Sequence, residues 1–239
     1  AAAEAEIRII AGDTKVVQKG KADGLYINTT GIGIVAPEIH ISGNNARPGD
    51  LIIVSGPIGD HGIAVLSARG DLGFEADVSS DTAPLNKIVA EMLREFDDPT
   101  LKSCAKHDES GKRHPDIHVL RDPTRGGLAA SLNEIARQSE VGVILYETKI
   151  PVRPSVSAAC EILGFDPLYI ANEGKLIAVV AKQDAELVLE RMRDHPYGQS
   201  ARVIGEVIES PKGRVLMKTS IGSTRVIDMP GGELLPRIC

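Results

Sequence analysis

The chain ends in a cysteine, Cys239, which closes the segment Pro-Arg-Ile-Cys. A thiol in this position lies beside the terminal carboxylate, on a segment that no later residue holds in place. The Gly231-Gly232 pair before it gives the backbone freedom, and the prolines on either side favour extended conformations. Fully extended, the residues from Met229 onward would reach roughly 35 Å at ~3.3 Å per residue. This pattern predicts a thiol carrier that serves another domain's cleft or a partner protein, and a frayed terminus with an incidental cysteine is the alternative.

An acidic turn near the start of the chain combines Gly12, Asp13, Thr14 and Lys15. Gly12 permits a sharp turn between two expected strands, which leaves Asp13 and Lys15 at a strand end with backbone amides nearby. A carboxylate, a cation and available amides together suit a metal and phosphate site. A solvated hairpin with the same residues is the alternative.

A second acidic turn follows the short apolar run at residues 117–120. Asp122 stands at the expected strand end, and Thr124 with the Gly126-Gly127 pair opens a helix. Because the first N–H groups of a helix attract anions, this turn suits a carboxylate–metal contact beside a phosphate.

Two further loops carry ionisable side chains. Residues 55–62 form a strand end, a glycine-rich turn and a helix start, which predicts an anion-binding corner with His61 available for proton transfer. An exposed capping pair of Asp60 and His61 is the alternative reading of this corner. Glu173 lies between an amide and a glycine just before a buried strand, where a carboxylate acts either as a base or as a loop cap.

The segment from Asp97 to Asp116 is polar and irregular and contains Cys104, His107 and His114. These side chains are metal ligands in other proteins, but their spacing fits no Cys/His zinc pattern and only one thiol is present. We therefore interpret the segment as a surface insertion.

Strands and helices are expected to alternate through the chain, an α/β to α+β pattern without internal repeats. Turn-forming residues at 43–50 predict a domain boundary there. We expect domains at residues 1–45, 46–210 and 211–239, the last holding late strands and the mobile tail. The expected strands cover residues 7–10, 25–35, 51–54, 117–120, 141–146, 176–181, 202–209, 215–219 and 225–228, and the expected helices cover 63–69, 82–96, 129–138, 155–163 and 184–194.

Composition restricts the classes of function. The 239 residues carry a formal net charge of −6 with no basic run, which argues against a nucleic-acid partner. No apolar stretch approaches the ~20 residues of a membrane span, and the Ala-rich start lacks the order of a signal peptide. Three widely spaced cysteines indicate a reduced, cytoplasmic protein. An aromatic content of 3% without Trp makes stacking platforms improbable.

Taken together and in order, five motifs resemble the HypE family of hydrogenase expression/formation proteins. The motifs are residues 11–17, 55–62, 121–128, 172–175 and 236–239. That family belongs to the superfamily of aminoimidazole ribonucleotide synthetase, selenophosphate synthetase and thiamine-monophosphate kinase. The resemblance implies a PurM-like, two-domain α/β architecture in which residues 1–45 are the remaining part of an N-terminal ATP-binding domain. Members of the family carry a further N-terminal segment, so this domain is expected to be incomplete here, and the insertion at 97–116 is longer and more polar than the family pattern.

The resemblance also implies an enzyme, an ATP-dependent carbamoyl dehydratase of the carbon–oxygen lyase type. It would dehydrate an S-carboxamide on Cys239 to a thiocyanate, which supplies the cyanide ligand for nickel–iron hydrogenase assembly. The resemblance implies ATP and Mg²⁺ as cofactors, with Asp13 and Asp122 holding the metal. Glu173 would take a proton from the carbamoyl nitrogen, and Lys15, close to the same nitrogen, would orient or neutralise that group. His61 is a further catalytic candidate. The cofactor-binding candidates are Gly12, Thr14, Thr124, Gly126 and Gly127.

The implied partners are a carbamoyltransferase maturation protein that modifies Cys239, the iron-carrying scaffold proteins of hydrogenase maturation, and a second copy of the chain. Two other functions stay open. One is a small-molecule ATP-dependent synthetase or kinase of the same superfamily, for which the terminal cysteine would be irrelevant. The other is a non-catalytic docking protein with a recognition tail.

Overall fold

The structure is a computed structural model that describes residues 1–21, 24–70, 76–97 and 112–231. The chain divides into two compact units, Ala1–His40 and Ile41–Cys239. Among the described residues, no helix is both long enough and apolar enough to cross a membrane.

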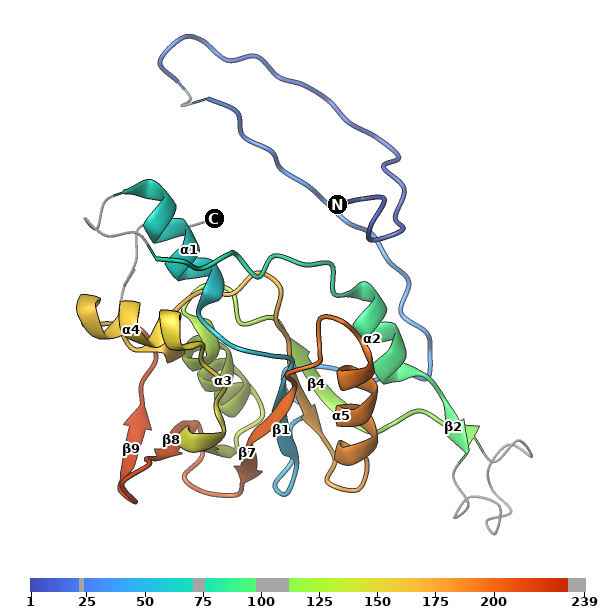
Figure 1. Cartoon of the computed structure of the whole chain (residues 1–239). Helices are drawn as coiled ribbons and strands as arrows, with labels where there is room; N and C mark the ends of the chain where they lie inside the picture. Colours follow the sequence, from blue (N-terminus) through green and yellow to red (C-terminus); the bar gives the residue numbers. More distant parts are fainter. Residues whose placement is uncertain (22–23, 71–75, 98–111, 232–239) are drawn as a thin grey trace. The chain divides into compact units, whose positions relative to one another are not determined.

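The second unit is built on a seven-stranded sheet with the order β4-β6-β1-β7-β5-β8-β9 (Figure 1). Neighbouring strands are antiparallel, except for β5 and β8, which run parallel. The strands are β1 (Leu51–Val54), β4 (Ile117–Arg121), β5 (Gly142–Tyr146), β6 (Ile177–Val180), β7 (Arg202–Ile208), β8 (Arg214–Lys218) and β9 (Thr224–Ile227).

The central strands read as continuous apolar runs because both faces of the sheet are covered. In β1, Ile52 and Val54 belong to the hydrophobic cluster on one face, and Ile53 belongs to the cluster on the other. The same alternation holds along β6. The sheet is therefore the middle layer of three.

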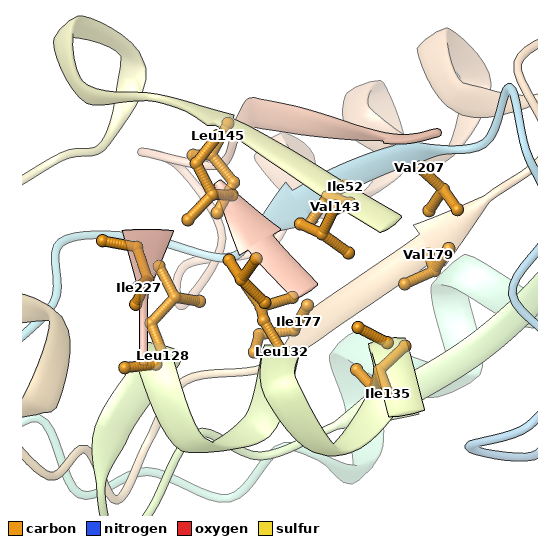
Figure 2. Packing of buried hydrophobic residues seen from close by; sticks show 14 of the residues in the cluster. Ile52, Leu128, Leu132, Ile135, Val143, Leu145, Ile177, Val179, Val207 and Ile227 are labelled. Carbon is orange, nitrogen blue, oxygen red and sulfur yellow. The ribbon is translucent and has the colours of Figure 1, made fainter. Parts of the chain in front are cut away.

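One face of the sheet is covered by helix α3 (Gly127–Gln138). Figure 2 shows Leu128, Leu132 and Ile135 of this helix pointing toward strand residues such as Val143 and Ile177. The spacing of these three leucine and isoleucine side chains places them on one stripe of the helix, as an amphipathic helix requires.

The opposite face is covered by α2 (Asn86–Leu93) and α5 (Ala185–Asp194), which lie side by side in Figure 1. Their apolar side chains pack against one another and against Ile53 and Ala178 of the sheet. Buried Arg191 of α5 donates to the carbonyl oxygens of Met92 and Arg94 at the end of α2, which satisfies carbonyl groups that a helix end leaves unpaired.

A third cluster joins α1 (Asp60–Arg69) to α4 (Pro154–Leu163) through side chains such as Ile63, Val156 and Ile170. The remaining elements are short: β2 (Phe96–Asp97) pairs with β3 (Lys112–Arg113), and two 3₁₀ turns cover Glu147–Lys149 and Pro167–Tyr169.

The strands predicted at residues 7–10 and 25–35 are wrong. The described part of the first unit has one helical turn, in which the Ala5 N–H donates to the Ala1 carbonyl, and otherwise neither helix nor strand. A strand requires a neighbour to take its backbone hydrogen bonds, and these residues have no such neighbour among the described residues of the unit. Their apolar side chains, among them Ile9 and Ile34, are exposed.

The elements predicted in the second unit are confirmed with small shifts, except for the helix predicted at 82–96. That helix covers only Asn86–Leu93. Pro84 disfavours helical geometry in Ala83 before it, and Phe96 belongs to strand β2. The predicted insertion lies mostly outside the described residues, which resume at Lys112. The predicted boundary at residue 210 falls inside the sheet, since β8 and β9 extend it.

We predict that Leu132→Ala lowers the free energy of unfolding by about 2–5 kcal/mol, because it leaves a cavity between α3 and the sheet. The matched control is Ile162→Ala on α4, whose side chain is 72% exposed. The control should change the free energy of unfolding by less than about 0.5 kcal/mol. Chemical denaturation measures both, and equal effects would contradict the packing described here.

Candidate active site

Three motif-bearing loops meet at one end of the sheet. The register pairs Val54, the last residue of β1, with Ile177, the first residue of β6, and pairs Ile177 with Arg121, the last residue of β4. The loop after β1, the loop after β4 and the loop before β6 are therefore neighbours. The sheet brings the predicted motifs at 55–62, 121–128 and 172–175 to one place.

The buried amide of Asn172 ties these loops together. Its Nδ2 donates to the carbonyl oxygens of Pro123 and Ile170, both at 3.0 Å, and its Oδ1 accepts from the Gly59 N–H at 2.8 Å. Its own backbone N–H donates to the Pro123 carbonyl at 3.2 Å. One side chain thus fixes the relative position of the three loops.

Gly127 permits a close approach between α3 and the loop before β6. Gly127 has φ +60°, and a Cβ there would lie 2.5 Å from the Ile170 carbonyl oxygen and 2.6 Å from that of Leu168. A larger residue would push the loop away from the helix start. The structure therefore gives Gly127 a packing role, and its predicted role in cofactor binding stays a prediction.

Asp81 holds the loop that carries Glu173. Its Oδ1 accepts from the Glu173 N–H at 3.0 Å, and its Oδ2 lies 3.3 Å from Lys175 Nζ. The Asp81 side chain is 2% exposed and that of Lys175 is 11% exposed. The segment that carries Asp81 connects α1 to α2, so it adds a fourth stretch of chain to the site.

His61 and Asp60 begin helix α1 beside that segment. His61 Nδ1 shares a hydrogen bond of 2.9 Å with Ser80 Oγ, and Ser80 Oγ shares another of 2.8 Å with Thr82. Asp60 Oδ2 accepts from Arg153 Nε at 2.9 Å. The alternative reading of Asp60 and His61 as one exposed capping pair does not hold, because Asp60 is buried and each side chain has a different partner.

Asp60, Asp81, Arg153 and Lys175 line a polar cleft of about 530 Å³. Asp60 lies beside Arg153 and Asp81 lies beside Lys175, so these four side chains balance in charge. A third carboxylate, Asp77, also lines the cleft and makes its lining acidic by one charge.

Asp122 and Thr124 lie on the loop after β4. Asp122 is exposed at the end of the strand, and the carbonyl oxygen of half-buried Thr124 accepts from the Gly127 N–H at 3.0 Å. The position of Asp122 agrees with the predicted strand end, and its predicted role as a metal ligand stays a prediction.

The other predicted residues do not belong to these loops of the second unit. Gly12, Asp13, Thr14 and Lys15 belong to the first unit, where all are exposed and the Thr14 N–H donates to Asp13 Oδ1 at 2.8 Å. Cys239 lies outside the described residues. Within the described residues, no group of three or more His, Cys, Asp or Glu side chains is placed to hold a metal ion.

Sequence reasoning missed Asn172, Asp81 and Lys175 as site residues. Asn172 and Lys175 were visible as parts of the motif at 172–175, but nothing in the motif indicated a cross-loop contact. Asp81 gave no signal, since it stands in an irregular stretch 92 residues before its hydrogen-bond partner.

Comparison with known proteins agrees with this architecture. The family described as AIR synthase related protein, C-terminal domain, matches residues 47–218. The carbamoyl dehydratase HypE of Azotobacter vinelandii is 52% identical over 239 residues, which are 100% of this chain and 65% of that protein. A solved HypE–HypF complex is 46% identical with a TM-score of 0.83, over 96% of this chain and 68% of that one. A HypE structure in complex with ATP is 45% identical with a TM-score of 0.69, over 83% of this chain and 55% of that one.

The sheet, its covering helices and the family match define a PurM-like, AIR synthase related domain, which confirms the expected fold class. Within that class, the chain belongs to the HypE family. The chain spans about 65% of the length of the Azotobacter vinelandii relative.

We predict that Asn172→Asp lowers the free energy of unfolding by at least about 2 kcal/mol. Aspartate keeps the oxygen that accepts from Gly59 but faces the carbonyls of Pro123 and Ile170 with an acceptor instead of a donor. Asn44→Asp, an exposed change of the same kind, is the control and should be nearly neutral. Equal unfolding free energies for the two variants would show that the Asn172 amide does not hold the loops.

A second prediction concerns Asp60. Burial raises the pKa of its carboxyl above the ordinary value of 3.8, because desolvation outweighs the hydrogen bond and charge of Arg153. The stability that this group contributes is fully present below the unfolded pKa and is lost as the pH rises through the higher folded pKa. Wild type should therefore gain unfolding free energy relative to Asp60→Asn as the pH falls from neutral toward 3.8. Chemical denaturation across that pH window tests this, and a difference independent of pH would contradict it.

Proposed function

We propose that this chain carries out the dehydration step of a carbamoyl dehydratase in nickel–iron hydrogenase maturation. The substrate would be an S-carboxamide on Cys239, and the product a thiocyanate that supplies the cyanide ligand. The observation that carries this proposal is the 52% identity to a carbamoyl dehydratase HypE along all 239 residues, because it includes every motif of the site.

The reaction needs a better leaving group than an amide oxygen. Transfer of the terminal phosphoryl group of ATP to that oxygen lets it leave as phosphate, while the carbon–nitrogen bond becomes a triple bond. The two protons on the carbamoyl nitrogen must be removed, so the step consumes ATP and the carboxamide and yields thiocyanate, ADP and phosphate. The ATP complex of a HypE relative supports ATP as the phosphoryl donor.

Glu173 is the proposed base for these protons. Its carboxylate stands on a short loop whose backbone is fixed on both sides, by Asn172 and by Asp81. A base acts only within hydrogen-bond reach of its proton, about 2.6–3.2 Å, so a fixed loop is the support that this role requires. Half-buried Glu173 meets that need better than a residue on a free loop.

Asp13 and Asp122 are the proposed Mg²⁺ ligands. In nucleotide sites Mg²⁺ takes one or two carboxylates and completes its shell with phosphate oxygens and water, so two exposed aspartates fit this donor chemistry. The metal would neutralise charge on the phosphates. Exposed Lys15 would lie close to the carbamoyl nitrogen and would orient or neutralise that group. The residues proposed to contact the nucleotide are Gly12, Thr14, Thr124, Gly126 and Gly127.

His61 is a weaker candidate than Glu173 for moving a proton of the substrate. Its Nδ1 is already engaged by Ser80, and its Nε2 is buried without a hydrogen-bond partner in the described structure. Proton transfer through this imidazole would need Nε2 to become accessible to the substrate.

The proposed partners follow from the covalent chemistry. A carbamoyltransferase must load Cys239, and the HypE–HypF complex supports a partner of this kind. Iron-carrying scaffold proteins would accept the cyanide, and the enzyme would act in the cytoplasm as a homodimer.

We predict that Glu173→Gln, in a protein of full family length, still binds ATP and still accepts the carbamoyl group on Cys239. Loss of water from that group should slow by roughly 10²–10⁴-fold, the effect of a lost general base. Mass spectrometry of the C-terminal peptide after addition of ATP follows the loss of one water.

Cys239→Ala is the control, since it should show neither carbamoylation nor water loss while keeping the stability of wild type. Normal water loss in Glu173→Gln would make Glu173 a loop cap. A wild-type protein that never changes mass at Cys239 would instead support a docking protein.

A further inference from the structure

We propose that Asp81 is a positioning residue that holds the Glu173 carboxylate in place for proton removal. This inference rests on the proposed function, because it assigns Asp81 a role through the base Glu173. Asp81 comes from the connection between α1 and α2, which no motif of the site includes.

Both carboxylate oxygens of Asp81 are directed at the loop of Glu173. Oδ1 accepts from the Glu173 N–H at 3.0 Å, and Oδ2 lies 3.3 Å from the ammonium group of Lys175. These two contacts are on either side of Gly174. The loop is therefore held at both of its ionisable residues by one side chain.

The backbone of Asp81 also fits closely against this loop. A Cβ at Gly174 would lie 1.7 Å from the Asp81 carbonyl oxygen and 2.8 Å from the Ala83 amide nitrogen. Only glycine allows the two stretches of chain to approach this closely. The fit leaves the loop no room to shift toward Asp81, while the two polar contacts oppose a shift away.

The ion pair is shielded from solvent, so water screens the attraction between its two charges less than at the surface. The Asp81 and Lys175 side chains are 2% and 11% exposed. Truncating one partner of such a pair leaves the other charge buried and uncompensated. Loss of the Asp81 carboxylate should therefore move Lys175 and the loop with it.

The segment that carries Asp81 is itself anchored to α1. The Ala76 N–H donates to Ser67 Oγ at 2.8 Å, and Ser80 shares its hydrogen bond with His61. Asp81 thus connects a helix of the domain to the loop of the proposed base. A base displaced by about 1 Å from its reactive geometry loses roughly a hundredfold in rate, so a contact of this kind matters for the reaction.

The test uses a protein of full family length, loaded at Cys239 by its carbamoyltransferase partner. Asp81→Ala removes both contacts, whereas Asp81→Asn keeps an oxygen that accepts from the Glu173 N–H. Glu209→Ala is the control, since it removes an exposed carboxylate that follows β7 at the end of the sheet opposite the site. The measurements are water loss from the C-terminal peptide at saturating ATP, ATP affinity, and hydrogen exchange of the Glu173 amide.

We expect Asp81→Ala to slow water loss by roughly a hundredfold, Asp81→Asn to slow it less, and the control to match wild type. ATP affinity should stay unchanged in all three, and the Glu173 amide should exchange faster in Asp81→Ala alone. The double variant Asp81→Ala with Glu173→Gln should be no slower than Glu173→Gln, because Asp81 acts through that residue.

Several outcomes would overturn the inference. They are normal water loss in Asp81→Ala, a rate loss in Asp81→Asn equal to that in Asp81→Ala, weakened ATP binding, or an additive double variant. Failure of the proposed function gives a different result, since wild type itself would then lose no water from the loaded peptide, while exchange of the Glu173 amide would still report whether Asp81 holds the loop.

Discussion

The hydrogen bonds of the Asn172 amide are the contacts on which the arrangement of the site depends. A buried primary amide is costly unless its donors and its acceptor are paired, and here they are paired with backbone groups of separate loops. Moving any one of the loops alone would leave a buried polar group unsatisfied. The loops after β1 and β4 and the loop before β6 therefore behave as one structure, although they are far apart in sequence.

The sheet register brings the three loops to one end of the sheet, and backbone packing between the loops then sets how closely they approach. Because β6 lies between β1 and β4, the ends that bear the loops are adjacent before any side chain is considered. Gly127 then lets α3 approach the loop before β6, and Gly174 lets the Asp81 segment approach the same loop from its other end. Backbone contacts at both ends of the loop before β6 therefore restrict the position of the Glu173 Cα atom.

Local patterns predicted the second unit well and the first unit poorly, for a physical reason. The apolar run Leu51–Val54 and the stripe of Leu128, Leu132 and Ile135 find their partners within the chain, so their periodicity matched the structure. The run at 25–35 has the same strand propensity, but the part of its unit that the structure describes holds no strand to pair with it. The loops that carry the motifs were predictable from residue type, whereas the contacts of Asn172 and Asp81 join distant segments, and no local pattern encodes them.

The two ion pairs of the cleft differ in how well each cation compensates its carboxylate. The Arg153 side chain is 60% exposed, so solvent screens its charge, and desolvation still raises the pKa of Asp60. Lys175 is 11% exposed, and its side-chain carbons pass close to Gly56. The charge of Asp81 is therefore compensated by a cation that solvent screens far less. Because Lys175 belongs to the same loop as Glu173, the better shielded of the two pairs is the one that restrains the proposed base.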